Sequence, residues 1–190
     1  RLEELGLSDN TAVLLISDHG TNFCDNPRRI IGKPEYSLYP GVMHLPLLAR
    51  VPGLTTAGTA RQEIVYNVDL VATVYDLAGV EPLQGVDGQS LLPLLGGQGA
   101  WTERPYVTCR YGHSVCMIDE HYWVIMNVDG QVLQAFDLAA DPHCRHDLGT
   151  SLPADVRDLA WHRILDDAGG ELPDYREKRR TDAIGQKPAD

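Results

Sequence analysis

The chain has 190 residues, of which 43% are hydrophobic and 23% are charged, a composition typical of a soluble globular protein that buries a core without disulfide or metal staples. Its 16 Lys and Arg against 27 Asp and Glu give a formal net charge of −11, which repels a phosphate backbone and argues against general nucleic-acid binding. No apolar run approaches the roughly 20 residues of a membrane helix. We therefore expect neither a nucleic-acid nor a membrane partner.

The first predicted strand is the apolar segment 11–16, which shows no alternation and is typical of a strand covered on both faces, as in a parallel α/β sheet. It ends in the polar segment 17–20, and open α/β sheets place their sites at such carboxyl ends. Asp18 offers an oxygen ligand and His19 a nitrogen ligand, half of a divalent-metal site. The alternative is an ordinary turn in which Asp18 caps the next element.

Residues 21–41 have no hydrophobic periodicity and predict a long loop, which in a compact domain is often functional. Lys33 lies within it, directly after Gly32, and is a candidate cation for a bound oxyanion. His44 precedes a second predicted strand, residues 45–51, and is a candidate donor to the same anion. Either side chain alone is more often solvated surface than part of a site.

The hydrophobic spacing of the rest of the chain predicts both helices and short strands. The spacing predicts strands at 63–66, 106–110, 122–126 and 132–136, and helices at 68–78 and 152–167. Asp129-Gly130 is a hairpin signal between the last two strands. We therefore predict an α/β fold in three parts. These are an α/β domain with a partial parallel sheet at 1–98, a small α+β subdomain with an antiparallel sheet and a C-terminal helix at 101–170, and a polar tail at 174–190.

The four cysteines are Cys24, Cys109, Cys116 and Cys144. An even count permits two disulfides, but a chain of this length does not need them. No C-x-x-C pair is present, so the sequence supports neither a zinc ribbon nor a thioredoxin motif. Four free thiols, some of them buried, are the simpler prediction.

Five segments in unbroken order resemble the sulfatase family, within the alkaline phosphatase superfamily. The resemblance covers about residues 1–150, and its most specific stretch is Gly-Val-Asp-Gly-Gln-Ser-Leu-Leu-Pro-Leu-Leu at 85–95. The other segments are 5–20 with its Ser-Asp-His-Gly end, 32–53 with its Gly-Lys start, 68–80, and 136–148 with its Phe-Asp-Leu start.

The resemblance implies a hydrolase that cleaves sulfate esters with one divalent metal, usually calcium. The family's nucleophile is a formylglycine made from the Cys or Ser of a C/S-x-P/A-x-R motif. By carry-over, Asp18 is a metal ligand and His19 a second ligand or its neighbour. Lys33 would bind the sulfate and stabilise its developing charge. His44 is a weaker catalytic candidate. The substrate would be a small sulfated or phosphorylated molecule.

The sequence also departs from the family pattern. No C/S-x-P/A-x-R motif occurs in the 190 residues, and Cys24 to Arg28 carries the right residue types at the wrong spacing. The paired aspartates that open the family's metal site are missing as well. The chain begins with Arg1, so we expect a C-terminal portion that is inactive alone. Its formylglycine would lie in a missing N-terminal part.

Two alternatives remain open. Many sulfatases have Asn where this chain has His19, and an imidazole ligand leaves room for manganese or zinc in place of calcium. That favours a phosphodiesterase or phosphonate hydrolase of the same superfamily. The other alternative is a non-catalytic remnant that binds a metal, an anion or a partner protein, with a second copy of the chain as one such partner.

Overall fold

The structure is a computed structural model that describes residues 1–81, 84–96 and 98–173. The polar tail predicted at 174–190 lies outside these residues. The chain forms two compact units that are interleaved in sequence, Arg1–His19 with Leu45–Pro105 and Gly20–His44 with Tyr106–Asp190. The α/β class, with a C-terminal antiparallel sheet and helix, is confirmed. Within the described residues, no helix has the length and hydrophobicity needed to cross a membrane.

In its described residues, the first unit contains two strands and one helix besides a 3-10 turn at Ser8–Asn10. Strand β1 (Val13–Ile16) pairs with β4 (Leu47–Arg50), so both long apolar segments form strands as predicted. The pairing is antiparallel, and the prediction of a parallel neighbour is wrong for these two strands. An apolar run indicates burial but carries no information on strand direction. Leu15 and Leu48 are 53% and 61% exposed, so β1 and β4 are not covered on both faces.

Helix α2 (Asp69–Ala78) follows its amphipathic sequence and ends at Gly79, whose left-handed φ of 64° lets its N–H turn back to the last carbonyls. The predicted helix 68–78 is therefore confirmed. Val68 holds the N-cap position, and no side chain caps the start of the helix. The strand predicted at 63–66 is absent, and those residues are irregular.

The second unit is built on a four-stranded antiparallel meander in the order β5-β6-β7-β8. Asp129-Gly130 forms the predicted hairpin between the last two strands. Strand β6 was not predicted, because its residues are apolar on both faces and show no alternation. The elements are β2 (Asn22–Phe23), β3 (Ile31–Gly32), α1 (Pro40–Met43), β5 (Tyr106–Tyr111), β6 (Ser114–Asp119), β7 (Tyr122–Asn127), β8 (Val132–Asp137), a 3-10 turn (Gly149–Ser151) and α3 (Ala154–Asp167).

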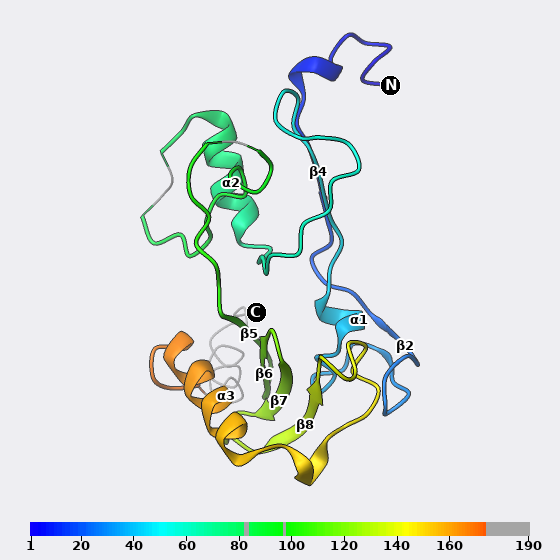
Figure 1. Cartoon of the computed structure of the whole chain (residues 1–190), viewed down its shortest axis with the longest axis vertical. Coiled ribbons are helices and arrows are strands. Elements are labelled where there is room, and N and C mark those ends of the chain that lie inside the picture. The colour runs from blue at the N-terminus through cyan, green and yellow to red at the C-terminus, as the bar shows by residue number, and fades with distance from the viewer. Residues whose placement is uncertain (82–83, 97, 174–190) are drawn as a thin grey trace, which may run out of the picture. The chain divides into compact units, whose positions relative to one another are not determined.

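Both faces of the meander are covered, which explains its apolar strands. Helix α3 lies along one face (Figure 1), where Ala160 and Ile164 pack among strand residues such as Val124. On the opposite face, Leu38 and Tyr39 pack in a cluster with Phe136 and other core residues. The long loop 20–44 is thereby held on the C-terminal sheet.

Candidate functional site

Asp18 and His19 form a tight corner directly after β1. Ser17 Oγ donates to the His19 carbonyl at 2.7 Å, and Asp18 Oδ1 accepts the His19 N–H at 2.9 Å. The second carboxylate oxygen, Oδ2, lies 3.5 Å from His19 Nε2. The two side chains are 85% and 44% exposed. The corner therefore presents an oxygen and a nitrogen donor side by side. Their role as metal ligands stays a prediction.

These two donors fit part of a metal site. A carboxylate oxygen suits Ca²⁺, and an imidazole nitrogen suits Mn²⁺ or Zn²⁺. Across residues 1–81, 84–96 and 98–173, no group of three or more His, Cys, Asp or Glu side chains is arranged to hold a metal ion. Asp18 and His19 would thus supply some of the ligands, and others would have to complete the shell.

Lys33 belongs to a short segment, residues 32–35, that we call the Lys33 loop. Its first residue, Gly32, pairs with Asn22 across the β2–β3 ribbon. The fully buried Asn22 side chain also donates to the Gly32 carbonyl at 2.9 Å. Lys33 follows directly and is exposed. The backbone before the lysine is therefore held by both the backbone and the side chain of Asn22.

The other end of the Lys33 loop is held by the turn between β5 and β6. Glu35 Oε1 accepts the backbone N–H of His113 at 2.5 Å and lies 2.8 Å from the His113 ring Nδ1. A β-carbon on Gly112 would lie 2.4 Å from Glu35 Cδ, so the turn leaves room for the carboxylate only because residue 112 is glycine. Sequence analysis identified neither Glu35 nor His113.

His44 is the residue that ends the short helix α1. Its backbone N–H donates to the Pro40 carbonyl at 2.8 Å, and its side chain is exposed. The start of this helix is fixed on the sheet, because the buried Tyr39 hydroxyl hydrogen-bonds Gln134. Trp123 Nε1 also donates to the Leu38 carbonyl at 2.9 Å. The backbone of His44 is thus well supported.

Two glycines close the loop that carries Lys33. The Gly20 N–H donates to the Val42 carbonyl at 2.9 Å. A β-carbon on Gly20 would lie 2.1 Å from the Gly41 carbonyl oxygen, a distance no real side chain tolerates. Around Gly41 the space is less tight, with Thr21 O and Asn22 Oδ1 at 3.2 and 3.3 Å from a β-carbon. The first and last turns of the loop therefore touch backbone to backbone.

The predicted site residues fall into two pairs. Asp18 and His19 belong to the first unit, whereas Lys33 and His44 belong to the second. The convergence of the two pairs on one ligand stays a prediction.

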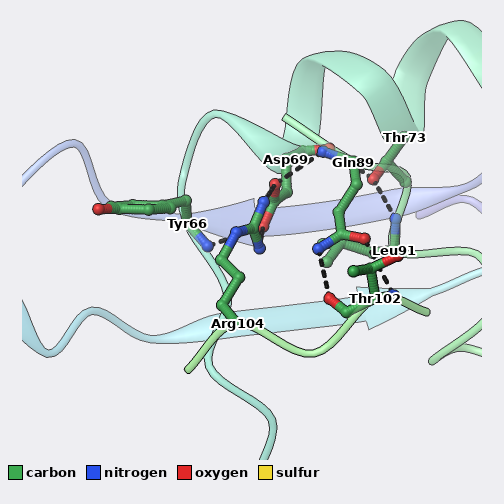
Figure 2. Close-up of polar contacts among 7 residues, drawn as sticks. All are labelled: Tyr66, Asp69, Thr73, Gln89, Leu91, Thr102 and Arg104. Carbon is green, nitrogen blue, oxygen red and sulfur yellow. Dashed lines mark hydrogen bonds and ion pairs between the residues drawn. The ribbon is translucent and has the colours of Figure 1, made fainter. Parts of the chain in front are cut away.

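A buried ion pair supports the first unit (Figure 2). The fully buried Asp69 carboxylate accepts hydrogen bonds from the two terminal guanidinium nitrogens of Arg104, at 2.6 and 2.8 Å, and from the backbone N–H groups of Tyr66 and Gln89. The guanidinium also lies 5.4 Å from the ring centroids of both Tyr66 and Trp101. Arg104 gave no signal in the sequence, because its partner lies 35 residues earlier in the chain.

Nearby, helix α2 and the segment at 85–95 are joined by further hydrogen bonds. The Leu91 N–H donates to Thr73 Oγ1 at 2.8 Å, and Gln89 Nε2 donates to the Thr102 carbonyl at 2.8 Å (Figure 2). Residues 85–95 are the stretch whose resemblance to sulfatases is most specific. Within the first unit, these hydrogen bonds hold the segment against helix α2 and Thr102.

Comparisons with known proteins agree with this architecture. The model of the C-terminal region of N-sulphoglucosamine sulphohydrolase matches residues 35–158. Arylsulfatase K of Gallus gallus is 30% identical over 172 residues, which covers 83% of this chain and 31% of that protein. The chain thus spans about a third of this relative's length.

Solved structures share the fold. The structure of BT4656 in complex with its substrate D-glucosamine-2-N,6-O-disulfate has a TM-score of 0.73 and 22% identity, covering 89% of this chain and 36% of that chain. The phosphonate monoester hydrolase of Agrobacterium radiobacter has the same TM-score and identity, and the match covers 90% of this chain and 37% of that chain. The family match over most of the chain's length and the similarity to Arylsulfatase K show that the chain belongs to the N-sulphoglucosamine sulphohydrolase C-terminal family and is the C-terminal part of a sulfatase-family protein.

Proposed function

We propose that this chain supplies metal-ligating and anion-binding residues to the active site of a metal-dependent hydrolase that cleaves sulfate esters. The observation that carries the proposal is the Lys33 loop. An exposed lysine lies between two hydrogen-bonded residues of this loop. Gly32 accepts a hydrogen bond from the Asn22 side chain, and Glu35 accepts one from the backbone of His113. Preorganised cations near a developing negative charge are a large source of transition-state stabilisation.

Each candidate residue has a stated role. Asp18 and His19 would hold the divalent metal, which when bound polarises the sulfate oxygens and lowers the pKa of the nucleophile. The Lys33 ammonium, with three donors and no acceptor, would bind the sulfate oxygens. His44 would be a second donor to the same group. The formylglycine nucleophile would come from outside these 190 residues, since no C/S-x-P/A-x-R motif occurs in them. We expect no turnover from the chain alone.

The substrate class follows from the anion-binding residues. A lysine ammonium is a compact point charge that reaches a sulfate in many orientations and recognises nothing of its organic half. The substrate of BT4656, D-glucosamine-2-N,6-O-disulfate, and the name of Arylsulfatase K both support a sulfated molecule. We propose a small sulfated substrate and leave its organic half open.

A second candidate is phosphonate or phosphate-diester hydrolysis. The observation that favours it is His19, whose imidazole adjoins the Asp18 carboxylate. A mixed nitrogen and oxygen donor pair suits manganese or zinc better than calcium. The shared fold of the Agrobacterium radiobacter enzyme is compatible with this alternative but does not select it.

The test uses the whole protein of which this chain is the C-terminal part. We expect Lys33→Ala to lower kcat/KM on 4-nitrophenyl sulfate by on the order of 100-fold, the loss typical of one transition-state donor. Arg145→Ala is the matched control, because Arg145 is also an exposed loop cation of the second unit. Unchanged kcat/KM in the Lys33 variant would exclude the proposed role.

The metal and the ester are tested in parallel. Asp18→Ala should lower the metal content measured by inductively coupled plasma mass spectrometry, whereas Asp9→Ala should not. Hydrolysis of bis(4-nitrophenyl) phosphate with manganese bound, but not of the sulfate ester, would favour the second candidate.

A further inference from the structure

Two cysteines lie directly opposite each other in the C-terminal meander. Cys109 on β5 is in register with Cys116 on β6. Opposite residues of antiparallel strands have Cα atoms about 4.5 to 5.5 Å apart, and their side chains lie on the same face. Disulfides need Cα separations of about 4.4 to 6.8 Å. Both thiols are reduced in this structure.

The environments of the two thiols differ. Cys116 is fully buried in the core cluster that contains Trp123 and Phe136, whereas Cys109 is partly exposed at its edge. A hydrogen bond with Cys116 lowers the pKa of Cys109. The same hydrogen bond, together with burial, raises the pKa of Cys116 well above its usual value. Cys109 is thus the more nucleophilic and accessible partner, and Cys116 stays protonated beside it.

We propose that Cys109 and Cys116 are an oxidation site that forms a disulfide across the β5–β6 hairpin when it meets a two-electron oxidant such as hydrogen peroxide. The Cys109 thiolate attacks one peroxide oxygen, and the O–O bond breaks to give Cys109 sulfenic acid and hydroxide. The Cys116 sulfur then attacks the Cys109 sulfur. The S–O bond breaks, water leaves with the Cys116 proton, and the hydroxide takes up the proton first lost by Cys109.

The other two cysteines are placed differently. Cys24 is exposed in the loop 20–44, where its thiol donates to the Arg29 carbonyl at 3.5 Å. Cys144 is buried, and burial raises the pKa of its thiol to about 12, with a contribution from the charge of Asp141. Neither has a cysteine opposite it in a strand register. Cys109 and Cys116 are therefore the pair that the described residues pre-position.

The cross-link would close the hairpin whose turn holds Glu35. The register between the two strands runs from Cys109 and Cys116 through two further residue pairs to the Gly112-His113 turn. The disulfide would link β5 to β6 two residue pairs from that turn and would not require the strands to separate. The inference does not depend on the proposed sulfatase activity, because it concerns thiols of this chain alone.

The experiment treats the reduced, folded 190-residue chain with an equimolar amount of hydrogen peroxide and maps its cysteines by non-reducing mass spectrometry. We expect a mass about 2 Da lower, two of the four thiols lost and full reversal by dithiothreitol. Cleavage after Arg110 separates Cys109 from Cys116, and cleavage at the aspartates between 119 and 141 separates Cys116 from Cys144. The expected product joins the Cys109 and Cys116 peptides.

Matched variants identify the partners. The cross-link should persist in Cys24→Ser and Cys144→Ser and should disappear in Cys109→Ser. The wild-type peptide map decides the question even if a variant fails to fold. A Cys116–Cys144 link, a dimer joined through Cys24, or Cys109 carried to sulfinic acid without a cross-link would each overturn the proposal.

Discussion

Glu35 and His113 form a two-point contact between the Lys33 loop and the tip of the β5–β6 hairpin. One carboxylate oxygen of Glu35 accepts the backbone N–H of His113 and faces its ring Nδ1. The Glu35 carboxylate thus contacts both the backbone and the ring of one residue at the hairpin tip. Lys33 lies two residues from Glu35, and its backbone position therefore depends on a residue 78 positions beyond Glu35.

The first prediction concerns this contact. Glu35→Ala should lower the free energy of unfolding by about 1 kcal/mol, because the side chain is partly exposed and the contact is screened by solvent. In the whole protein, it should also raise KM for a sulfate ester several-fold through displacement of Lys33. Glu35→Gln keeps an acceptor for the His113 N–H and should recover part of both losses. Urea unfolding and steady-state kinetics measure the two effects.

The control for this variant is Glu120→Ala, which removes an exposed carboxylate at the opposite end of the same sheet. It should change neither stability nor KM. If Glu35→Ala and Glu120→Ala behave alike, Glu35 does not position Lys33.

Much of the fold could be predicted from local sequence. Helices α2 and α3 are amphipathic, α2 ends at Gly79 whereas Gly169 follows the C-cap Ala168 of α3, and the Asp129-Gly130 turn is a short-range signal. Strand β6 could not be predicted in the same way, because burial on both faces removes the alternation that marks a strand. The direction of β1 against β4 depends on their pairing, which no local pattern records.

In the candidate site, too, local contacts could be predicted and long-range contacts could not. Asp18 and His19 are neighbours in sequence, so their contact was predictable from the corner that follows β1. Lys33 was a candidate anion-binding cation from its place in the long loop, and the resemblance to sulfatases supplied its role in binding the sulfate. The contact between Glu35 and His113, which holds the Lys33 loop, connects segments far apart in the chain. No periodicity or spacing in the sequence encodes that contact.

The second prediction compares two glycines. Gly20→Ala places a β-carbon 2.1 Å from the Gly41 carbonyl, so the backbone must move, and we expect a loss of about 2 to 3 kcal/mol. Gly41→Ala meets its nearest oxygens at 3.2 to 3.4 Å and gains about 1 kcal/mol of helix propensity. It should be close to neutral. Thermal unfolding of the two variants measures the difference, and equal losses would contradict this geometry.

The third prediction concerns the ion pair between Asp69 and Arg104. Arg104→Ala leaves a buried carboxylate without its cation and should lower the free energy of unfolding by about 3 to 5 kcal/mol. Arg104→Lys should recover only part of this loss, because lysine cannot make the bidentate contact. A double-mutant cycle with Asp69→Asn measures the coupling.

Arg157→Ala is the matched control for the ion pair. Arg157 pairs with Asp158 on the exposed face of α3, where an ion pair contributes about 0 to 1 kcal/mol. A coupling between Asp69 and Arg104 no larger than that of this surface pair would show that the buried contact does not stabilise the first unit.

The fourth prediction concerns alkaline pH. Burial raises the pKa of Cys144 to about 12, whereas an unfolded cysteine titrates near pH ~8.5. A group whose pKa is higher in the folded state stabilises the fold fully below its unfolded pKa, and that contribution is lost as pH rises towards the folded value. Stability should therefore fall above pH ~8.5, with up to about 2 kcal/mol from Cys144 by pH ~10. Burial also raises the pKa of Tyr39, which acts in the same direction.

Urea unfolding between neutral and alkaline pH measures this loss, and Cys144→Ala isolates the thiol. The variant should be less stable at neutral pH, because it leaves a cavity beside Leu38 and Phe136 in the core cluster. Its stability should nevertheless fall less steeply with pH than that of the wild type, since it has no thiol proton to lose. Identical slopes in the two proteins would mean that Cys144 titrates at its ordinary pKa in the folded chain and is not shielded by the core.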